Sequence, residues 1–443
     1  MTTISSDSPK TQVNRILPLI EKNYNNNVDS DYTEKIEDLD KNFKYSSNSN
    51  HYWREPEHSL FYGTPLYQQA SLSQKLSLNH LSWIFLYRKV ADSEMEITHY
   101  NTITADCLIA ANSDYEILVK TLAQETAQER KHIHAFYQVS YQTTIALLGK
   151  KALINSASKN CSEPDWKRTQ IDNYLSSSAN FVNQMTFQKK EQYHAENLKQ
   201  GKDINKHISL TTQGFFNGTL GHSSQSLRQF FPLNWGSYPF LAANFYAVRY
   251  MANLLLKSFE FNIHNYYKKL ERNQEFIPIP TSISHYHFLD ESFHTTTSLF
   301  LGRDFYKYLP KPSIYEKFIA NLAILQAQRE NLNGFSAVLP YYFLRDDGYM
   351  IGFMMKLLQS PLFDMSATEA LHWIEKCLCH EHEGFHLNLK LHNHLLTELR
   401  KFAENLDYLW PINREMRVMA SGGSIKKAIQ NNITIFRKFS QAL

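Results

Sequence analysis

The chain has 443 residues, of which 43% are hydrophobic, so it can bury the core of one large domain or of two ordinary ones. Its 46 Lys and Arg nearly cancel its 43 Asp and Glu, and a net charge of +3 provides no basic footprint for nucleic acid. The four cysteines are few for this length, so we interpret them as reduced thiols in a cytoplasmic protein.

Residues 1–50 are polar except for one apolar patch at 16–20, which predicts a flexible or loosely docked N-terminal extension. This stretch lacks the apolar core and basic flank of a signal peptide. No apolar run in the chain approaches the about 20 residues that a membrane span needs. We therefore expect a soluble protein without a membrane partner.

From residue 71 onward the apolar residues recur every three or four positions, which predicts helices rather than strands. We predict four long helices, at residues 71–110, 115–150, 240–272 and 282–308. The first two are separated by Asn112-Ser113-Asp114, and the last two by a break that contains Pro278 and Pro280. The sequence therefore predicts two helical hairpins in an all-α protein.

We expect these helices and the less regular insertion between them to form one unit over residues 51–310. We also predict additional helices at both ends of the chain, with those of residues 311–443 packing on this unit. The clearest of these is an amphipathic run at 424–440 with Ser424 as its N-cap.

The strongest local signal is a Glu-x-x-His pair that occurs twice, as Glu129 with His132 and as Glu291 with His294. Because residues three apart share one face of a helix, each pair can present a carboxylate and an imidazole to the same cavity. Helical bundles that hold two metal ions take one such pair from each of two helices and a lone Glu from each of the other two. The sequence thus predicts a metal centre between the hairpins.

The geometry of the two predicted hairpins indicates which glutamate each of the other two helices contributes. Glu94 lies 35 residues before Glu129, and the midpoint falls in the first predicted turn. The same test pairs Glu260 with His287 and Glu291 across the second turn, and Glu260 stands in an apolar context where an unpaired carboxylate would be costly. His287 lies one helical turn before Glu291 and offers a third imidazole.

Two further glutamates lie close to the predicted ligands in the sequence, and their roles must be considered. Glu96 passes the hairpin test almost as well as Glu94, and we interpret Glu125 as a solvated residue. Four carboxylates and three imidazoles suit iron or manganese and differ from the thiolate-rich sets of structural zinc sites.

This spacing resembles the seven-ligand pattern of the AurF-type di-iron arylamine N-oxygenases. Chain length, the polar N-terminus and the C-terminal helices are more similar to the cyanobacterial dimetal-carboxylate halogenases of the CylC type. The residues that carry the resemblance, and that it implies as metal ligands and catalytic residues, are Glu94, Glu129, His132, Glu260, His287, Glu291 and His294.

The resemblance implies a ferritin-like four-helix bundle that activates O₂ at two iron ions, with a manganese–iron pair left open. For the CylC type it further implies chloride as co-substrate, and chlorination of an unactivated C–H bond on a fatty acyl chain held by an acyl carrier protein in natural-product biosynthesis. N-oxygenation of an amine or aromatic substrate would use the same residues. The electron donor is unidentified, and a homodimer is left open.

If the substrate is carried on an acidic protein, a basic surface patch is expected. Two groups of residues are candidates, and a solvated helix face accounts for either of them equally well: Lys426, Lys427, Arg437 and Lys438, or Lys268, Lys269 and Arg272.

A rival motif lies at His382-Glu383-x-x-His386, the form of a zinc peptidase site, with His392 six residues further on. No glycine turn follows His386, so a continuing helix would place His392 on another face. Gly384 also weakens the helix that would present both ligands. We therefore favour surface histidines on a partly buried helix. A non-catalytic ferritin-like iron-binding protein is a third reading, and the length of the chain speaks against it because storage bundles are compact.

Overall fold

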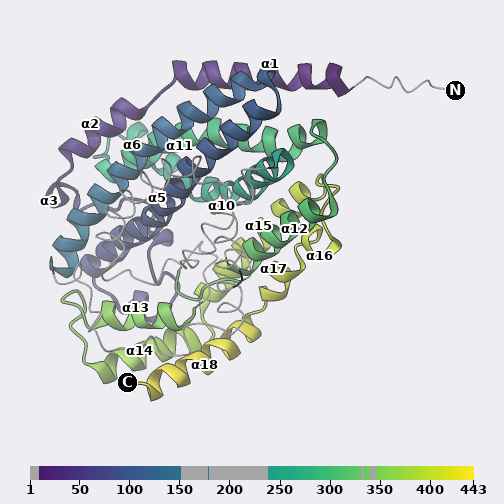
Figure 1. Ribbon diagram of the computed structural model, residues 1–443. Coiled ribbons are helices and arrows are strands. Elements are labelled where there is room, and N and C mark those ends of the chain that lie inside the picture. The colour runs from purple at the N-terminus through teal and green to yellow at the C-terminus, as the bar shows by residue number, and fades with distance from the viewer. Residues whose placement is uncertain (1–8, 151–177, 179–237, 331–333, 340–345) are drawn as a thin grey trace.

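The computed structural model describes residues 9–150, 178, 238–330, 334–339 and 346–443 (Figure 1). Within these residues all regular structure is helical, and no strand occurs among them. The predicted all-α class is confirmed. Most of the predicted insertion between the two hairpins lies outside the described residues.

The four predicted long helices are present with bounds close to those expected. They are α5 (Leu72–Ala111), α6 (Glu116–Leu148), α10 (Pro239–Arg272) and α11 (Ile279–Leu299). The first predicted turn contains a short 3₁₀ turn, Ser113–Tyr115, and the fourth helix ends earlier than predicted, continuing as a π turn (Phe300–Asp304) and a 3₁₀ turn (Phe305–Tyr308).

Local sequence explains where α5 and α10 begin. The Ser71 side chain accepts from Gln74 N at 3.2 Å while the Gln74 side chain accepts from Ser71 N at 2.9 Å, which forms a capping box ahead of α5. Pro239 occupies the first turn of α10, where its missing N–H leaves no hydrogen bond unmade.

The two hairpins pack into a closed four-helix arrangement. Helix α5 lies against α6 and α10 against α11, while α10 also contacts α5 and α11 contacts α6 (Figure 1). This is the helix arrangement expected of a ferritin-like bundle. Each long helix therefore presents one face to a shared interior.

The N-terminal stretch forms additional helices, as predicted, and these pack against the bundle rather than forming a flexible or loosely docked extension. It forms α1 (Pro9–Asp29), α2 (Thr33–Asn42) and α3 (Tyr45–Asn48), and α1 and α2 pack against both α6 and α11. Ile20 and Ile36 are fully buried there. The polar composition concealed this docking because asparagine side chains contribute to it beside the few buried apolar ones, Asn23 bonding to α11 and Asn27 to α6.

The C-terminal region forms further helices, as predicted, and these comprise α12 (Ile314–Glu330), α13 (Gly348–Leu358), α14 (Ala367–Cys379), α15 (Glu383–Ala403), α16 (Pro411–Arg414), α17 (Arg417–Gly422) and α18 (Ile425–Gln441). Helices α12 and α15 contact α10, whereas α13, α14 and α18 pack on one another (Figure 1). Ser424 caps α18 as expected, accepting from Lys427 N at 3.4 Å. The unit boundaries at residues 50 and 310 stay a prediction.

None of the helices that the structure describes combines the length and the apolar character that a bilayer crossing requires. Cys377 and Cys379 are not joined in a disulfide. Cys161 lies outside the described residues.

Gly302, in the π turn that follows α11, fixes how closely this turn approaches α10. A Cβ atom at this position would lie 2.4 Å from the backbone nitrogen of Ala247. We expect Gly302→Ala to lower the free energy of unfolding by about 1–3 kcal/mol or more, because backbone cannot move aside as a side chain can. Chemical denaturation measures this change.

Gly352 in α13 is the matched control, since its added Cβ would meet only Phe439 Cε2 at 3.9 Å. Gly352→Ala should be neutral or stabilising by up to about 1 kcal/mol, the difference in helix propensity. Equal effects of the two substitutions would contradict the close-packing argument.

Candidate metal centre

The seven predicted ligands come from the four bundle helices and all point inward. Glu94 lies on α5, Glu129 and His132 on α6, Glu260 on α10, and the last three on α11. Every one is buried, with exposed fractions between 0% and 4%. Burying so many ionisable groups together is costly without compensation, so the cluster requires a physical explanation.

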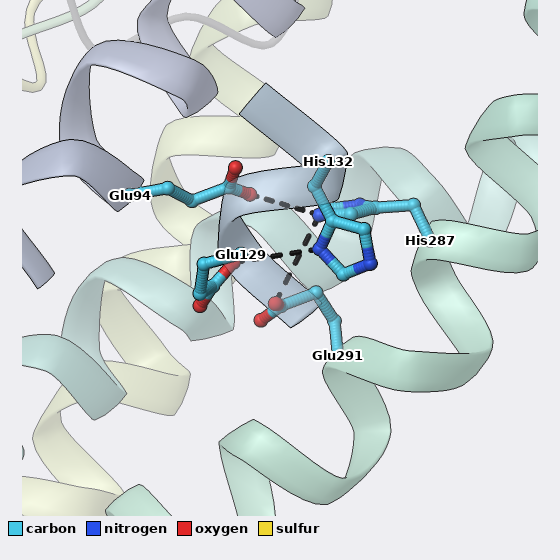
Figure 2. A group of neighbouring side chains, drawn as sticks. All are labelled: Glu94, Glu129, His132, His287 and Glu291. Atoms are coloured by element: carbon cyan, nitrogen blue, oxygen red, sulfur yellow. Dashed lines mark hydrogen bonds and ion pairs between the residues drawn. The ribbon is translucent and has the colours of Figure 1, made fainter. Parts of the chain in front are cut away.

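Five of the seven converge most tightly, each offering one ligand atom within 4.8 Å of the others (Figure 2), and they are Glu94, Glu129, His132, His287 and Glu291. Figure 2 shows their side chains pointing toward one another from three helices. Glu94 belongs to this group, whereas Glu96 is only half-buried and does not. The structure thus favours Glu94 for the first helix.

The remaining two predicted residues contact the group directly. Glu260 Oε1 lies 2.5 Å from Nδ1 of His287, whose Nε2 is 2.9 Å from Glu94 Oε1. Tyr87 OH donates to the same oxygen of Glu260 at 3.2 Å. Glu260 is therefore held at the cluster by α11 and α5 together.

His294, the other predicted ligand outside the group of five, contacts two of its members. Its Nδ1 lies 2.6 Å from Glu291 Oε1 and 3.3 Å from Glu129 Oε1. His132 Nδ1 is 3.4 Å from the second oxygen of Glu129. Both Glu-x-x-His pairs consequently meet at Glu129.

A buried arginine, which the sequence reasoning missed, balances part of the negative charge. Arg249 on α10 donates to Glu125 Oε2 at 2.7 Å and to Glu129 Oε1 at 3.1 Å. The prediction that Glu125 is solvated was wrong, since it is fully buried. Helical spacing could have revealed Arg249, because its separation of 11 positions from Glu260 brings both onto nearly one face.

The protonation states show the electrostatic cost of the arrangement. Burial, reinforced by the nearby Glu129 carboxylate, raises the pKa of Glu94 to about 7. Burial alone would raise the pKa of Glu129 too, but His294, His132 and Arg249 hold that pKa well below its usual range. Burial would lower the pKa of His132, but contacts with Asp290 and Glu129 raise it to about 9. Without a metal, the cluster is thus balanced by protonated imidazoles.

Several buried ligand atoms still make no hydrogen bond among the described residues: Glu94 Oε2, Glu260 Oε2, and the facing pair Glu129 Oε2 and His132 Nδ1, which lie 3.4 Å apart without hydrogen-bond geometry. Three carboxylate oxygens and one imidazole nitrogen left in this way are the atoms that cations would satisfy. Metal ions would replace the imidazole protons and remove the repulsion among the carboxylates. The residues present therefore fit a metal centre with oxygen and nitrogen donors.

The rival histidine motif does not form a comparable group. His382 precedes α15 as its N-cap, and its ring contacts Cys377 O at 2.7 Å and accepts from Gly384 N at 3.2 Å. The exposed His386 pairs with Glu381 at 2.8 Å. His392 is turned to Met419 O at 3.2 Å, so the three imidazoles are each engaged elsewhere.

Fold and site together define a helical-bundle protein with a candidate metal centre of carboxylates and imidazoles at its interior. Comparison with known families is consistent with this class. A family model described as acyl halogenase, CylC-like, matches residues 15–440, and the chain belongs to this family. It is therefore a halogenase-family enzyme. No curated protein and no solved structure matches the chain.

Substitution of Glu291 and of Glu383 distinguishes the bundle centre from the His382 region as the metal site. Glu291→Ala should abolish metal occupancy, because Glu291 lies in the converged group, whereas Glu383→Ala should leave it intact, because Glu383 is exposed on α15. Elemental analysis of both variants, each checked for helical content, measures this. Loss of metal only from the Glu383 variant would move the site to the His382 region.

Proposed function

We propose that the chain is an O₂-dependent non-heme enzyme that holds two iron ions and chlorinates an unactivated C–H bond of a fatty acyl chain on an acyl carrier protein. One observation carries this proposal. In a member of the acyl halogenase family, a buried cluster of carboxylates and imidazoles retains unpartnered donor atoms at the centre of the bundle.

Two ions account for the donor set better than one. Seven candidate donors exceed the six that an octahedral ion accepts, and they fall into two neighbouring groups. Glu94 and Glu260 both contact His287, while Glu129 contacts both His132 and His294, and the latter contacts Glu291. Mixed oxygen and imidazole donors suit iron, and they fit a manganese–iron pair as well.

The metal ions, when bound, would supply the O₂ activation that removing hydrogen from an unactivated carbon requires, with chloride as the source of the new substituent. The chain's own residues hold these ions and exclude water. Tyr87 and Phe136 contact the His287 ring edge-on, at centroid distances of 6.0 and 4.9 Å. These two aromatic rings cover part of the fully buried His287 ring and help to exclude water from it.

A small pocket beside α10, with a mostly apolar lining, is compatible with part of an acyl chain. Its apolar lining comes from Leu254, Leu255 and Phe259 on α10 and from Leu391 and Leu395 on α15, polar side chains such as Asn388 and Glu398 complete it, and its volume is about 60 Å³. Phe259 immediately precedes Glu260, so the pocket adjoins the helix segment that reaches the cluster. Apolar lining suits a fatty acyl chain better than a polar amine.

The exposed side of α18 is the surface we assign to the carrier protein. Lys426, Lys427, Arg437 and Lys438 are all exposed, and the α18 sequence contains no acidic residue. Residues 11 apart lie nearly above one another on a helix, so Lys426 with Arg437 and Lys427 with Lys438 form two adjacent basic rows on α18. By contrast, Lys268 and Lys269 are ion-paired with Glu271 and Glu55.

The metal and oxygen requirement can be measured directly. Protein reconstituted anaerobically with ferrous iron should bind about two irons per chain and give a transient visible absorption after an O₂ pulse. With acyl-carrier substrates and chloride, the product should lose one hydrogen and gain one chlorine, which mass spectrometry reads from the isotope pattern.

The control for this experiment is the same reaction without chloride, which should yield no chlorinated product. A single tightly bound zinc and no reaction with O₂ would overturn the proposed function. A hydroxylated or N-oxygenated product in the presence of chloride would retain the metal centre but replace the reaction.

The carrier-protein surface predicts a charge effect on binding. Lys426→Glu combined with Arg437→Glu should raise KM for the carrier-bound substrate about tenfold, with kcat and iron content unchanged, since charges at an interface act mainly on association. Rising salt should weaken wild-type binding in the same direction.

Lys268→Glu combined with Lys269→Glu is the matched control, with the same charge change at residues already ion-paired. A larger rise of KM in this control than in the α18 variant would place the carrier protein at the end of α10 instead.

A further inference from the structure

The two Glu-x-x-His histidines are oriented by residues outside the proposed ligand set. His294 Nε2 lies 2.9 Å from Gln128 Oε1, and His132 Nε2 lies 3.1 Å from Asp290 Oδ2. Each partner immediately precedes the glutamate of the opposite pair, so the contacts cross between α6 and α11. Both histidines thus have Nε2 engaged away from the cluster and Nδ1 directed into it.

The N-terminal segment in turn holds both of these partners. Asn27 on α1 exchanges two hydrogen bonds with Gln128, donating from Nδ2 to Oε1 and accepting at Oδ1 from Nε2, each at 2.9 Å. The backbone N–H of Tyr32, between α1 and α2, donates to Asp290 Oδ1 at 3.3 Å. Two relays therefore run from the N-terminal segment to the two histidines.

The exchange with Asn27 determines which atom of Gln128 faces the ring. Because the Gln128 amide group is used on Asn27 Oδ1, its oxygen is the atom presented to His294. A carbonyl oxygen only accepts, so His294 Nε2 must carry the hydrogen and Nδ1 is left for a metal. Asn27 and Gln128 are 2% and 1% exposed, so little water competes for these bonds.

We propose that the N-terminal segment α1–α2 is part of the metal centre, with Asn27 acting through Gln128, and Tyr32 N–H acting through Asp290, to hold His294 and His132 with Nδ1 toward the metals. Asn27, Gln128 and Asp290 are then positioning residues. This inference rests on the proposed metal centre but extends it to a segment whose sequence gives no sign of it.

Co²⁺ titration of the full chain under anaerobic conditions tests the relay through Asn27. Asn27→Ala should weaken Co²⁺ affinity about 10–100-fold, the usual effect of losing a group that orients a metal-bound histidine, and should alter the visible Co²⁺ bands. Gln128→Leu should do the same. In the Gln128→Leu background, Asn27→Ala should have no further effect, because the two residues act in series.

Asn23→Ala is the matched control, one turn earlier on α1. The Asn23 amide also ties α1 to α11, through Phe293 O at 3.1 Å and Thr297 Oγ1 at 3.2 Å, but these bonds do not end on a candidate ligand. It should loosen α1 similarly, as seen in the thermal midpoint, and leave the Co²⁺ affinity and spectrum unchanged. Equal Co²⁺ binding by the Asn27 and Asn23 variants would overturn the proposal.

Gln128→Glu serves if Asn27→Ala does not fold, since it keeps an oxygen for His294 and should retain the affinity that Gln128→Leu loses. Equal Co²⁺ binding by both Gln128 variants would also overturn the relay. If wild-type protein binds no Co²⁺, the proposed function fails together with this inference. If wild type binds two Co²⁺ ions and the Asn27 variant binds them with the same affinity, only the inference fails.

Discussion

The structure depends on burying a concentrated group of charges in the middle of a helical bundle. An ionised carboxylate loses several kcal/mol of hydration when it is buried, and this is recovered only through close partners of opposite charge. Arg249 supplies one such partner to both Glu125 and Glu129. The imidazoles supply others, yet donor atoms on Glu94 and Glu260 stay unmatched, which is the physical argument for metal ions at this position.

The need to compensate these buried charges explains what each helix contributes to the interior. Helix α10 contributes Glu260 and Arg249 to the interior while α12 and α15 pack on it, so it is covered on several sides and carries apolar residues around much of its circumference. Helices α6 and α11 carry the Glu-x-x-His pairs and exchange the contacts of Gln128 and Asp290. The N-terminal helices then lie on α6 and α11, where their asparagines meet polar groups that apolar side chains would leave unsatisfied.

The hairpin reasoning succeeded because helical rise is nearly constant, so equal distances from a turn bring residues level in antiparallel helices. Glu94 with Glu129, and Glu260 with His287, were placed in this way. The choice between Glu94 and Glu96 lay beyond this test, because two residues differ little in height. They differ by more than half a turn in direction, which only packing of α5 against its neighbours resolves.

Periodicity and turn residues in the sequence by themselves determined the four long helices, their pairing into hairpins and the seven inward-facing candidates, since all of these follow from local backbone geometry. Tertiary structure alone decided that Glu125 is buried against Arg249, that His382 caps α15 rather than joining a metal site, and that Asn27 reaches Gln128. Each of these depends on contacts between residues distant along the chain or on the exact start of a helix. Hydrogen bonds of polar side chains leave no periodic trace in the sequence, and for that reason the N-terminal segment could be recognised as part of the site only after folding.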